Sequence, residues 1–231
     1  MNVNQVIVSS VLTGFVVSSS PPLGSVAAQS GGTASQTIWE NDRMQVRRVT
    51  LAPGERLSGD STGGSVIVFL TTDLDGRIPP AEAAWRDAGP VTMENRGRAR
   101  FEALVVDLKG SATRSGGVTA PEVVRASGTV APSVSGGMYA GTMRAQNIVL
   151  NDRISVTKER YVLSWPVDPL HFHPQDSVVI YLRGGYIWPT TSFYGPDRVR
   201  RGDVRVLPGN VFHRTGNAGS DPLEFLLIIP A

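Results

Sequence analysis

The strongest constraint on the fold of this chain is a set of three sequence matches between its two halves. The matching segments are Asn41–Asp42–Arg43 with Asn151–Asp152–Arg153, 65–70 (SVIVFL) with 177–182 (SVVIYL), and Asn95–Arg96–Gly97 with Asn217–Ala218–Gly219. In chain order the matches lie 110, 112 and 122 residues apart. Because the separation only grows along the chain, the pattern indicates one duplicated unit whose second copy has longer loops.

Each half consists of short segments with the composition of β-strands. The segments are rich in β-branched and aromatic residues and are separated by turn formers, in keeping with the 25 Gly and 16 Pro among 231 residues. The predicted strands are 43–51, 65–70, 101–108, 160–165, 177–182, 204–207, 211–215 and 224–229. One short segment, 79–87, leans toward a helix. Many short strands without intervening helices predict an all-β sandwich or barrel in each half.

Composition also suggests where the domains begin and end. Residues 29–37 are small and polar, and we expect them to be disordered. Residues 109–146 are dense in Gly, Ser, Thr, Ala and Pro, which is typical of a linker. A structureless segment of this length is improbable inside one compact domain. We therefore predict one domain at 38–108 and a second at 147–231.

The N-terminus carries part of the pattern of a secretory signal. An apolar run at 6–17 is followed by small residues near an expected cleavage site after Ala28. The run is too short for a membrane span, which needs about 20 residues. Residues 1–28 contain no Lys or Arg, so the alternative is an extension that stays on the protein. We predict a signal peptide at 1–28 and a periplasmic or secreted protein.

Charge and cysteine content exclude several kinds of function. The chain has 22 basic and 20 acidic residues, a net charge of +2, which argues against a nucleic-acid partner. It has no cysteine, which excludes disulfides, thiolate metal sites and cysteine nucleophiles.

All three histidines of the chain fall in the second half. His171 and His173 are separated by one residue, so on a β-strand their side chains point to the same face. His213 follows the turn formers Pro208 and Gly209, on a segment that could return to the same interior. The three imidazoles could thus converge on one ion.

These residues resemble the two motifs of the cupin superfamily. The first motif is His-x-His, three or four residues, Glu, six residues and Gly; the second is Gly, five residues, Pro-x-Gly, two residues, His, three residues and Asn. The first reads here as His171–Phe172–His173, Ser177 and Gly184, and the second as Gly202, Pro208–Gly209–Asn210, His213 and Asn217. The resemblance covers 147–231 and, with the repeat, implies two tandem cupin-type double-stranded β-helix (jelly-roll) barrels.

The resemblance implies a metal site but also a departure from the usual ligand set. The family's Glu ligand is replaced by Ser177, so the leading interpretation is a site of His171, His173 and His213 alone. Asp176 is out of phase with the ligands, although Pro174 breaks the strand and leaves Asp176 as an alternative fourth ligand. Such a set suits one divalent transition metal, Fe, Zn, Cu, Ni or Mn.

Two further residues are candidates for lining a pocket at this site. Ser177 and Tyr181 share one face of their predicted strand with residue 179. Histidines on an apolar face are often simply core residues. That interpretation is disfavoured here because all three occupy motif positions.

The first half lacks the ligand set. At the repeat separations its matching positions are Gly59, Ser61 and Val91, none of which binds a transition metal. We expect this half to be a degenerate, metal-free cupin-like barrel that packs against the second barrel or covers its mouth.

The expected function is that of a metal-binding bicupin acting on a small-molecule ligand or substrate. The three-histidine set is similar to that of the cysteine-dioxygenase and diketone-cleaving cupins, which suggests a dioxygenase-like enzyme. No catalytic acid or base is identified, so the alternative is a non-catalytic, exported module that binds a small ligand or the metal. A homodimer is compatible with either interpretation.

Overall fold

The computed structural model describes residues 34–72, 80–110, 143–162, 171–189, 196–213 and 215–231. All of them belong to one folding unit, residues 33–231. The predicted signal peptide at 1–28 and most of the predicted linker lie outside the described residues. Within the described ranges the regular structure consists of β-strands, which confirms the all-β prediction. Among these residues no helix is long and apolar enough to cross a membrane.

The strands fall into two groups that follow each other along the chain. The first group is β1 (Ser35–Glu40), β2 (Met44–Leu51), β3 (Arg56–Ser61), β4 (Ser65–Phe69), β5 (Ala83–Arg86), β6 (Gly89–Glu94) and β7 (Phe101–Leu108). The second group is β8 (Met143–Leu150), β9 (Ile154–Tyr161), β10 (Ser177–Tyr181), β11 (Gly185–Pro189), β12 (Asp197–Val199), β13 (Val204–Leu207), β14 (Thr215–Asn217) and β15 (Leu223–Pro230).

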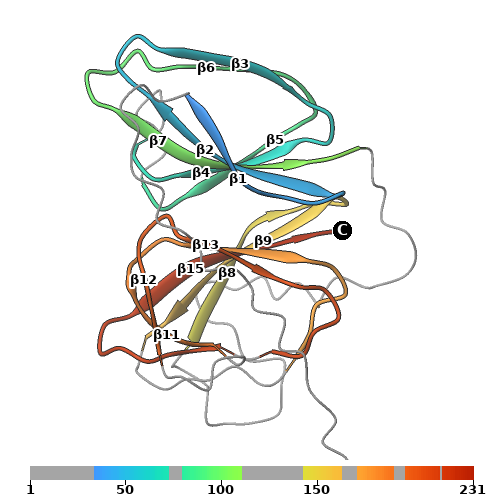
Figure 1. Ribbon diagram of the computed structural model, residues 1–231, viewed down its shortest axis with the longest axis vertical. Helices are drawn as coiled ribbons and strands as arrows, with labels where there is room; N and C mark the ends of the chain where they lie inside the picture. Colours follow the sequence, from blue (N-terminus) through green and yellow to red (C-terminus); the bar gives the residue numbers. More distant parts are fainter. Residues whose placement is uncertain (1–33, 73–79, 111–142, 163–170, 190–195, 214) are drawn as a thin grey trace, which may run out of the picture. The chain divides into compact units, whose positions relative to one another are not determined.

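Each group forms one five-stranded sheet and one smaller sheet, and all pairings are antiparallel. The first large sheet has the order β1-β2-β7-β4-β5, and the second, read in the matching direction, has the order β8-β9-β15-β10-β13. The smaller sheets are β3-β6 and β12-β11-β14 (Figure 1). The two large sheets therefore have the same topology, as a duplicated unit requires.

The repeated Asn-Asp-Arg segments form the same turn in both halves. Asn41 Oδ1 accepts hydrogen bonds from the backbone N–H groups of Arg43 and Met44, both at 2.8 Å. Asn151 makes the same pair of bonds at the start of β9, at 2.9 and 3.0 Å. An Asn side chain that mimics a backbone turn in this way is a strong local signal, which explains why the repeat is visible in the sequence here.

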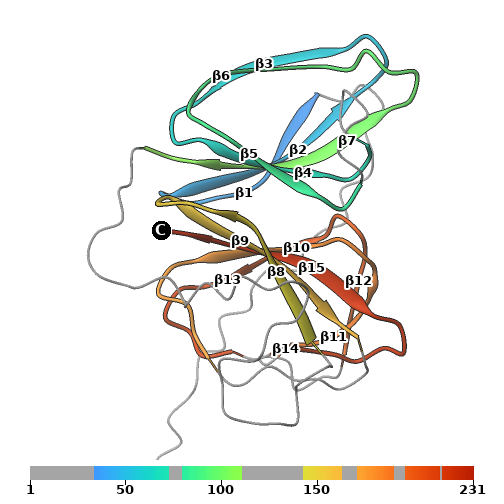
Figure 2. The ribbon, with the colours of Figure 1, turned by 180° about the vertical axis from the view of Figure 1, so that it is seen from behind.

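The two large sheets pack against each other. Their strands face each other (Figures 1 and 2), and side chains from both sheets form one buried apolar cluster. Its buried members are Met44, Val46, Val66, Val68, Leu70, Leu104, Val106, Leu108, Ile154, Val156, Val178, Ile180, Leu182, Leu226 and Ile228. At the edges, Arg48 Nη2 donates a hydrogen bond to the Gly202 carbonyl at 2.7 Å, and Lys158 pairs with Glu82 at 3.0 Å.

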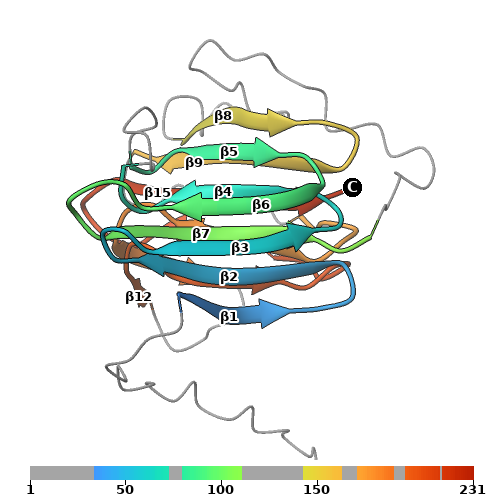
Figure 3. The same cartoon turned by 90° about the horizontal axis from the view of Figure 1, so that it is seen from above.

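The opposite face of each large sheet lies against its own smaller sheet. In β10, Val178 and Ile180 belong to the cluster between the halves, whereas Val179 and Tyr181 belong to the apolar interior of the second half. Seen from above, the strands of the stacked sheets run nearly in line (Figure 3). Burial on both faces explains why β4 and β10 are continuous apolar runs rather than alternating ones.

Several boundaries differ from those expected from sequence. β1 begins at Ser35, within the stretch 29–37 that was expected to be disordered, and the first domain therefore starts before residue 38. β8 begins at Met143, so the second domain starts before residue 147 and the predicted linker ends before 146. Both are outer strands of their sheets, where few apolar side chains are needed and periodicity is weak.

Two local predictions were also wrong. The segment expected to lean toward a helix contains β5, which pairs with β4. The strand predicted at 211–215 is instead a single bridge at His213 followed by the short β14. In both places pairing with a neighbouring strand outweighs weak local propensity.

The packing of the two sheets predicts which core substitutions cost most. Ile180→Ala removes a fully buried side chain from the cluster between the halves, and we expect it to lower the free energy of unfolding by about 2–5 kcal/mol. Ile38→Ala, at an isoleucine that is 41% exposed on β1, is the matched control and should cost well under half as much. Urea denaturation of both variants measures the difference. An equal loss of unfolding free energy in the two variants would contradict the assignment of Ile180 to the central core.

Candidate functional site

The three histidines lie on two neighbouring segments that the backbone holds together. The His171 N–H donates to the His213 carbonyl at 2.9 Å, and the His213 N–H donates to the His171 carbonyl at 2.7 Å. This exchange makes an isolated antiparallel bridge between the two residues. His173 follows two residues later, and its carbonyl accepts a hydrogen bond from the Asn210 N–H at 2.6 Å. Backbone pairing therefore sets the spacing of the imidazoles.

The imidazole rings meet at one point. One nitrogen from each of His171, His173 and His213 lies within 4.8 Å of the other two. The ring centroids of the three pairs are 4.5–5.1 Å apart. The structure thus brings together the three residues that the sequence predicts as ligands, in an arrangement that could hold a metal ion.

Two buried polar atoms of the second half lack hydrogen-bond partners in the part of the chain that the structure describes. His173 Nε2 and Ser177 Oγ are both buried, with no hydrogen-bond partner among the described residues. Buried polar groups are nearly always satisfied, so the unpartnered nitrogen on one of the three converging imidazoles is a candidate ligand atom. His213 Nδ1 lies 2.9 Å from the Val211 carbonyl oxygen. With its proton on Nδ1, His213 donates to that carbonyl and keeps Nε2 as an unprotonated ligand atom.

The electrostatics of the cluster favour a neutral imidazole at His173. Burial, together with the neighbouring His171 and His213, lowers the pKa of His173 to about 4. A neutral ring with an unpartnered buried nitrogen is the form that coordinates a metal. With three nitrogen donors and no carboxylate in the group, the donor set fits a divalent transition metal better than Mg²⁺ or Ca²⁺.

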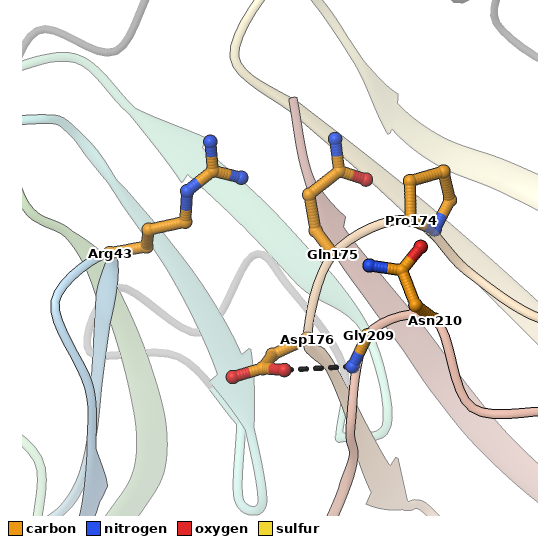
Figure 4. A pocket seen from close by; sticks show the side chains of 6 residues that line it. All are labelled: Arg43, Pro174, Gln175, Asp176, Gly209 and Asn210. Carbon is orange, nitrogen blue, oxygen red and sulfur yellow. Dashed lines mark hydrogen bonds between the residues drawn. The ribbon is translucent and has the colours of Figure 1, made fainter.

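Asp176, the alternative fourth ligand, has other partners. Its Oδ1 accepts a hydrogen bond from the Gly209 N–H at 2.8 Å (Figure 4). Its Oδ2 accepts from Asn41 Nδ2, also at 2.8 Å. Among the described residues, the group that could hold a metal consists of the three histidines without Asp176. The carboxylate thus serves a contact between the two halves.

The pocket candidates lie on the inner face of β10. Ser177 is fully buried and Tyr181 is 1% exposed. The Tyr181 ring packs at 6.0 Å from that of Phe225. Burial raises the pKa of Tyr181, so the phenol stays protonated at neutral pH and can act only as a hydrogen-bond donor or acceptor.

Sequence reasoning did not identify Glu159 as a residue of the second half's interior. Glu159 lies on β9 opposite Phe225 of β15, whose ring belongs to the interior cluster, and it is 8% exposed. Side chains of directly paired residues share a face, so the Glu159 carboxylate is on the inner side. Tyr161 shares this face, and its hydroxyl lies 3.1 Å from Thr215 Oγ1. Strand alternation from residue 155 to 161 could have found both residues.

The matching positions in the first half contain no imidazole. Gly59 pairs with Val91 between β3 and β6, as His171 pairs with His213 in the second half. This agreement supports the repeat separations that the sequence suggested. Ser61, which matches His173, is buried and lies 2.9 Å from Ser65 Oγ.

Comparisons with known proteins give the fold a name. No protein-family model matches the sequence, and no curated protein matches it significantly. Among solved structures, the chain is similar to a cupin 2 conserved barrel domain protein from Leptotrichia buccalis, with TM-score 0.58 and 16% identity over 89% of this chain and 92% of that one.

Two other structures extend this likeness. A salicylate 1,2-dioxygenase from Pseudoaminobacter salicylatoxidans, solved as adducts with gentisate, has TM-score 0.58 and 9% identity over 88% of this chain and 75% of that one. A putative glyoxylate induced protein from Pseudomonas aeruginosa has TM-score 0.54 and 15% identity over 85% and 80%. At these identities the likeness concerns the fold alone, and it confirms that the chain has the cupin fold.

Proposed function

We propose that the second half binds one divalent transition metal through His171, His173 and His213, and that the metal serves the oxidation of a small molecule by dioxygen. The observation that carries the proposal is the meeting of three imidazoles, one of which has a buried, unpartnered and neutral nitrogen. A redox metal held there would supply dioxygen activation. Three protein ligands leave coordination positions free, which a catalytic site requires.

The apolar interior of the second half favours a small, partly apolar substrate. Val179, Ile187 and Phe225 belong to the apolar interior of the second half. Tyr181 stays protonated and can orient an oxygen of the substrate by a hydrogen bond. The gentisate adducts of the similarly folded salicylate dioxygenase support a small aromatic acid as the first substrate to try.

A non-catalytic binding module is the second candidate. It is favoured by Ser177, which stands where the cupin motif has a carboxylate ligand and is itself a poor ligand. In this alternative the same histidines hold the metal, or a small ligand on it, without turnover.

Metal content tests the site. We expect purified protein to hold about one metal per chain, since the matching positions of the first half offer no nitrogen ligands. His171→Ala, His173→Ala and His213→Ala should each lose most of it, as measured by mass spectrometry of the bound metals. Ser61→Ala, at the position that matches His173, is the control and should keep the metal. Full metal content in His213→Ala would mean that the site is elsewhere.

Oxygen consumption separates the two candidate functions. If the protein is a dioxygenase, the iron-loaded form should consume oxygen when gentisate or a related aromatic acid is added, and His173→Ala should not. Tightly held zinc without oxygen consumption would favour the binding module.

The pKa of His173 predicts how the metal-free protein responds to acid. Its folded-state pKa of about 4 lies below the unfolded value of about 6.5, so between these values the unfolded chain binds more protons. The contribution of His173 to stability is therefore complete above about pH 6.5 and is lost as the pH falls toward 4. Urea denaturation of the metal-free protein at several pH values should show a shallower decline for His173→Gln than for wild type. An identical decline of the unfolding free energy with falling pH in both proteins would contradict a buried, neutral His173 ring.

We also propose that the protein is exported after removal of residues 1–28. Intact-mass measurement of protein recovered from its native host tests this, and we expect a chain that begins near Gln29. A mass that includes Met1 would show that the segment stays on the protein.

A further inference from the structure

We infer that Asp176 is a positioning residue that ties both histidine-bearing segments to the first half of the chain through Asn41. The inference rests on the metal-binding function proposed above and assigns the metal-free half a part in it. It concerns a contact between the halves rather than a metal ligand.

One carboxylate connects three segments. Asp176 lies three residues after His173, and it accepts a hydrogen bond from the N–H of Gly209, four residues before His213. Its other oxygen accepts from the Asn41 side chain, 135 residues away in sequence, at 2.8 Å. Figure 4 shows the carboxylate turned toward Gly209, beside the turn that Asn210 completes. Hydrogen bonds to an ionised carboxylate are among the stronger ones in proteins.

The two histidine-bearing segments are in close contact at this point. A Cβ on Gly209 would lie 2.8–3.0 Å from backbone atoms of Pro174, Gln175 and Asp176, so there is no room for a side chain. Asn210 has a positive φ of 59° and donates its N–H to the His173 carbonyl. The turn cannot shift without moving His173, and Asp176 holds the turn. Displacement of either segment would change the distances among the imidazoles.

Asn41 is fixed in an orientation that presents a donor to Asp176. Its Oδ1 is occupied by the backbone N–H groups of Arg43 and Met44, which leaves Nδ2 for the carboxylate. Asn151 occupies the matching position and makes the same turn in the second half. The pair offers a matched control, because the same substitution disturbs the same turn in both places.

The test uses the full chain and four variants. Asn41→Asp keeps the acceptor of the turn but replaces the donor with a negative charge that faces Asp176. Asn151→Asp makes the same change in the second half. Asp176→Asn alone leaves two amides facing each other, whereas the double variant Asn41→Asp with Asp176→Asn restores the hydrogen bond with donor and acceptor exchanged. Cobalt(II) titration by absorbance gives the metal dissociation constant of each variant.

The expected pattern has three parts. Asn41→Asp and Asp176→Asn should each raise the dissociation constant about tenfold or more, as is usual when a residue that orients metal ligands is lost. Asn151→Asp should change it by no more than about twofold. The double variant should recover most of the wild-type affinity. Thermal unfolding of the metal-free variants identifies any loss that comes from unfolding.

Two results would overturn the inference. If Asn41→Asp binds cobalt as Asn151→Asp does, the contact between the halves does not position the site. If the double variant stays as weak as Asp176→Asn, the carboxylate acts in another way, for example as a ligand.

A second measurement keeps the inference separate from the proposed function. In the metal-free protein, amide hydrogen exchange at Gly209 should be faster in Asn41→Asp than in wild type, because the acceptor of that N–H is no longer held. Unchanged exchange would overturn the inference. If the wild-type protein binds no metal and Asn41→Asp still exchanges faster at Gly209 than wild type, the proposed function is overturned. The contact between the halves would then still stand.

Discussion

Burial of the two five-stranded sheets against each other is the interaction on which the rest of this structure depends. It removes one face of β4 and β10 from water, and the smaller sheets cover the other face, so every side chain on these strands is committed to one of two interiors. Val178 and Ile180 therefore fill the contact between the halves. Ser177 and Tyr181 consequently face the interior of the second half. A register shift of one residue would exchange these sets and place apolar side chains at the site.

The candidate site lies at the position where the regular pairing between the strands of these sheets stops. His171 and His213 exchange two backbone hydrogen bonds as an isolated bridge, outside the named strands. Short irregular segments are free to bring side chains together, but they need other contacts to hold them in place. Asp176 and the close approach at Gly209 supply such contacts here, and Asn41 connects them to the first half. The positions of the three imidazoles thus depend on residues that are not themselves metal ligands.

The sequence predicted those features whose physical signal is local. The runs at 65–70 and 177–182 are apolar throughout because both faces are buried, and Asn41 and Asn151 recur because an Asx turn needs that side chain. The histidine spacing identified the ligand candidates.

Features that depend on distant partners were missed. β3 and β6 carry polar residues and become strands through their mutual pairing. The role of Asp176 depends on Asn41, a contact that no local pattern indicates. Glu159 looks like a surface residue until its register with Phe225 places it inside.

The two halves have the same fold but differ in whether their buried polar groups have hydrogen-bond partners. In the first half, Ser65 Oγ lies 2.6 Å from Asp107 Oδ1, and Asp107 pairs with Arg47 at 2.7 Å. The desolvation cost of a partly buried ion pair is offset only when its remaining polar atoms find hydrogen-bond partners, and here Ser65 supplies one to Asp107. Ser177 matches Ser65, yet its hydroxyl lacks a partner among the described residues, as does His173 Nε2. In the first half, Ser65 and Asp107 thus find their partners within the described residues. A bound metal or ligand would offset the cost of burying these two polar atoms of the second half.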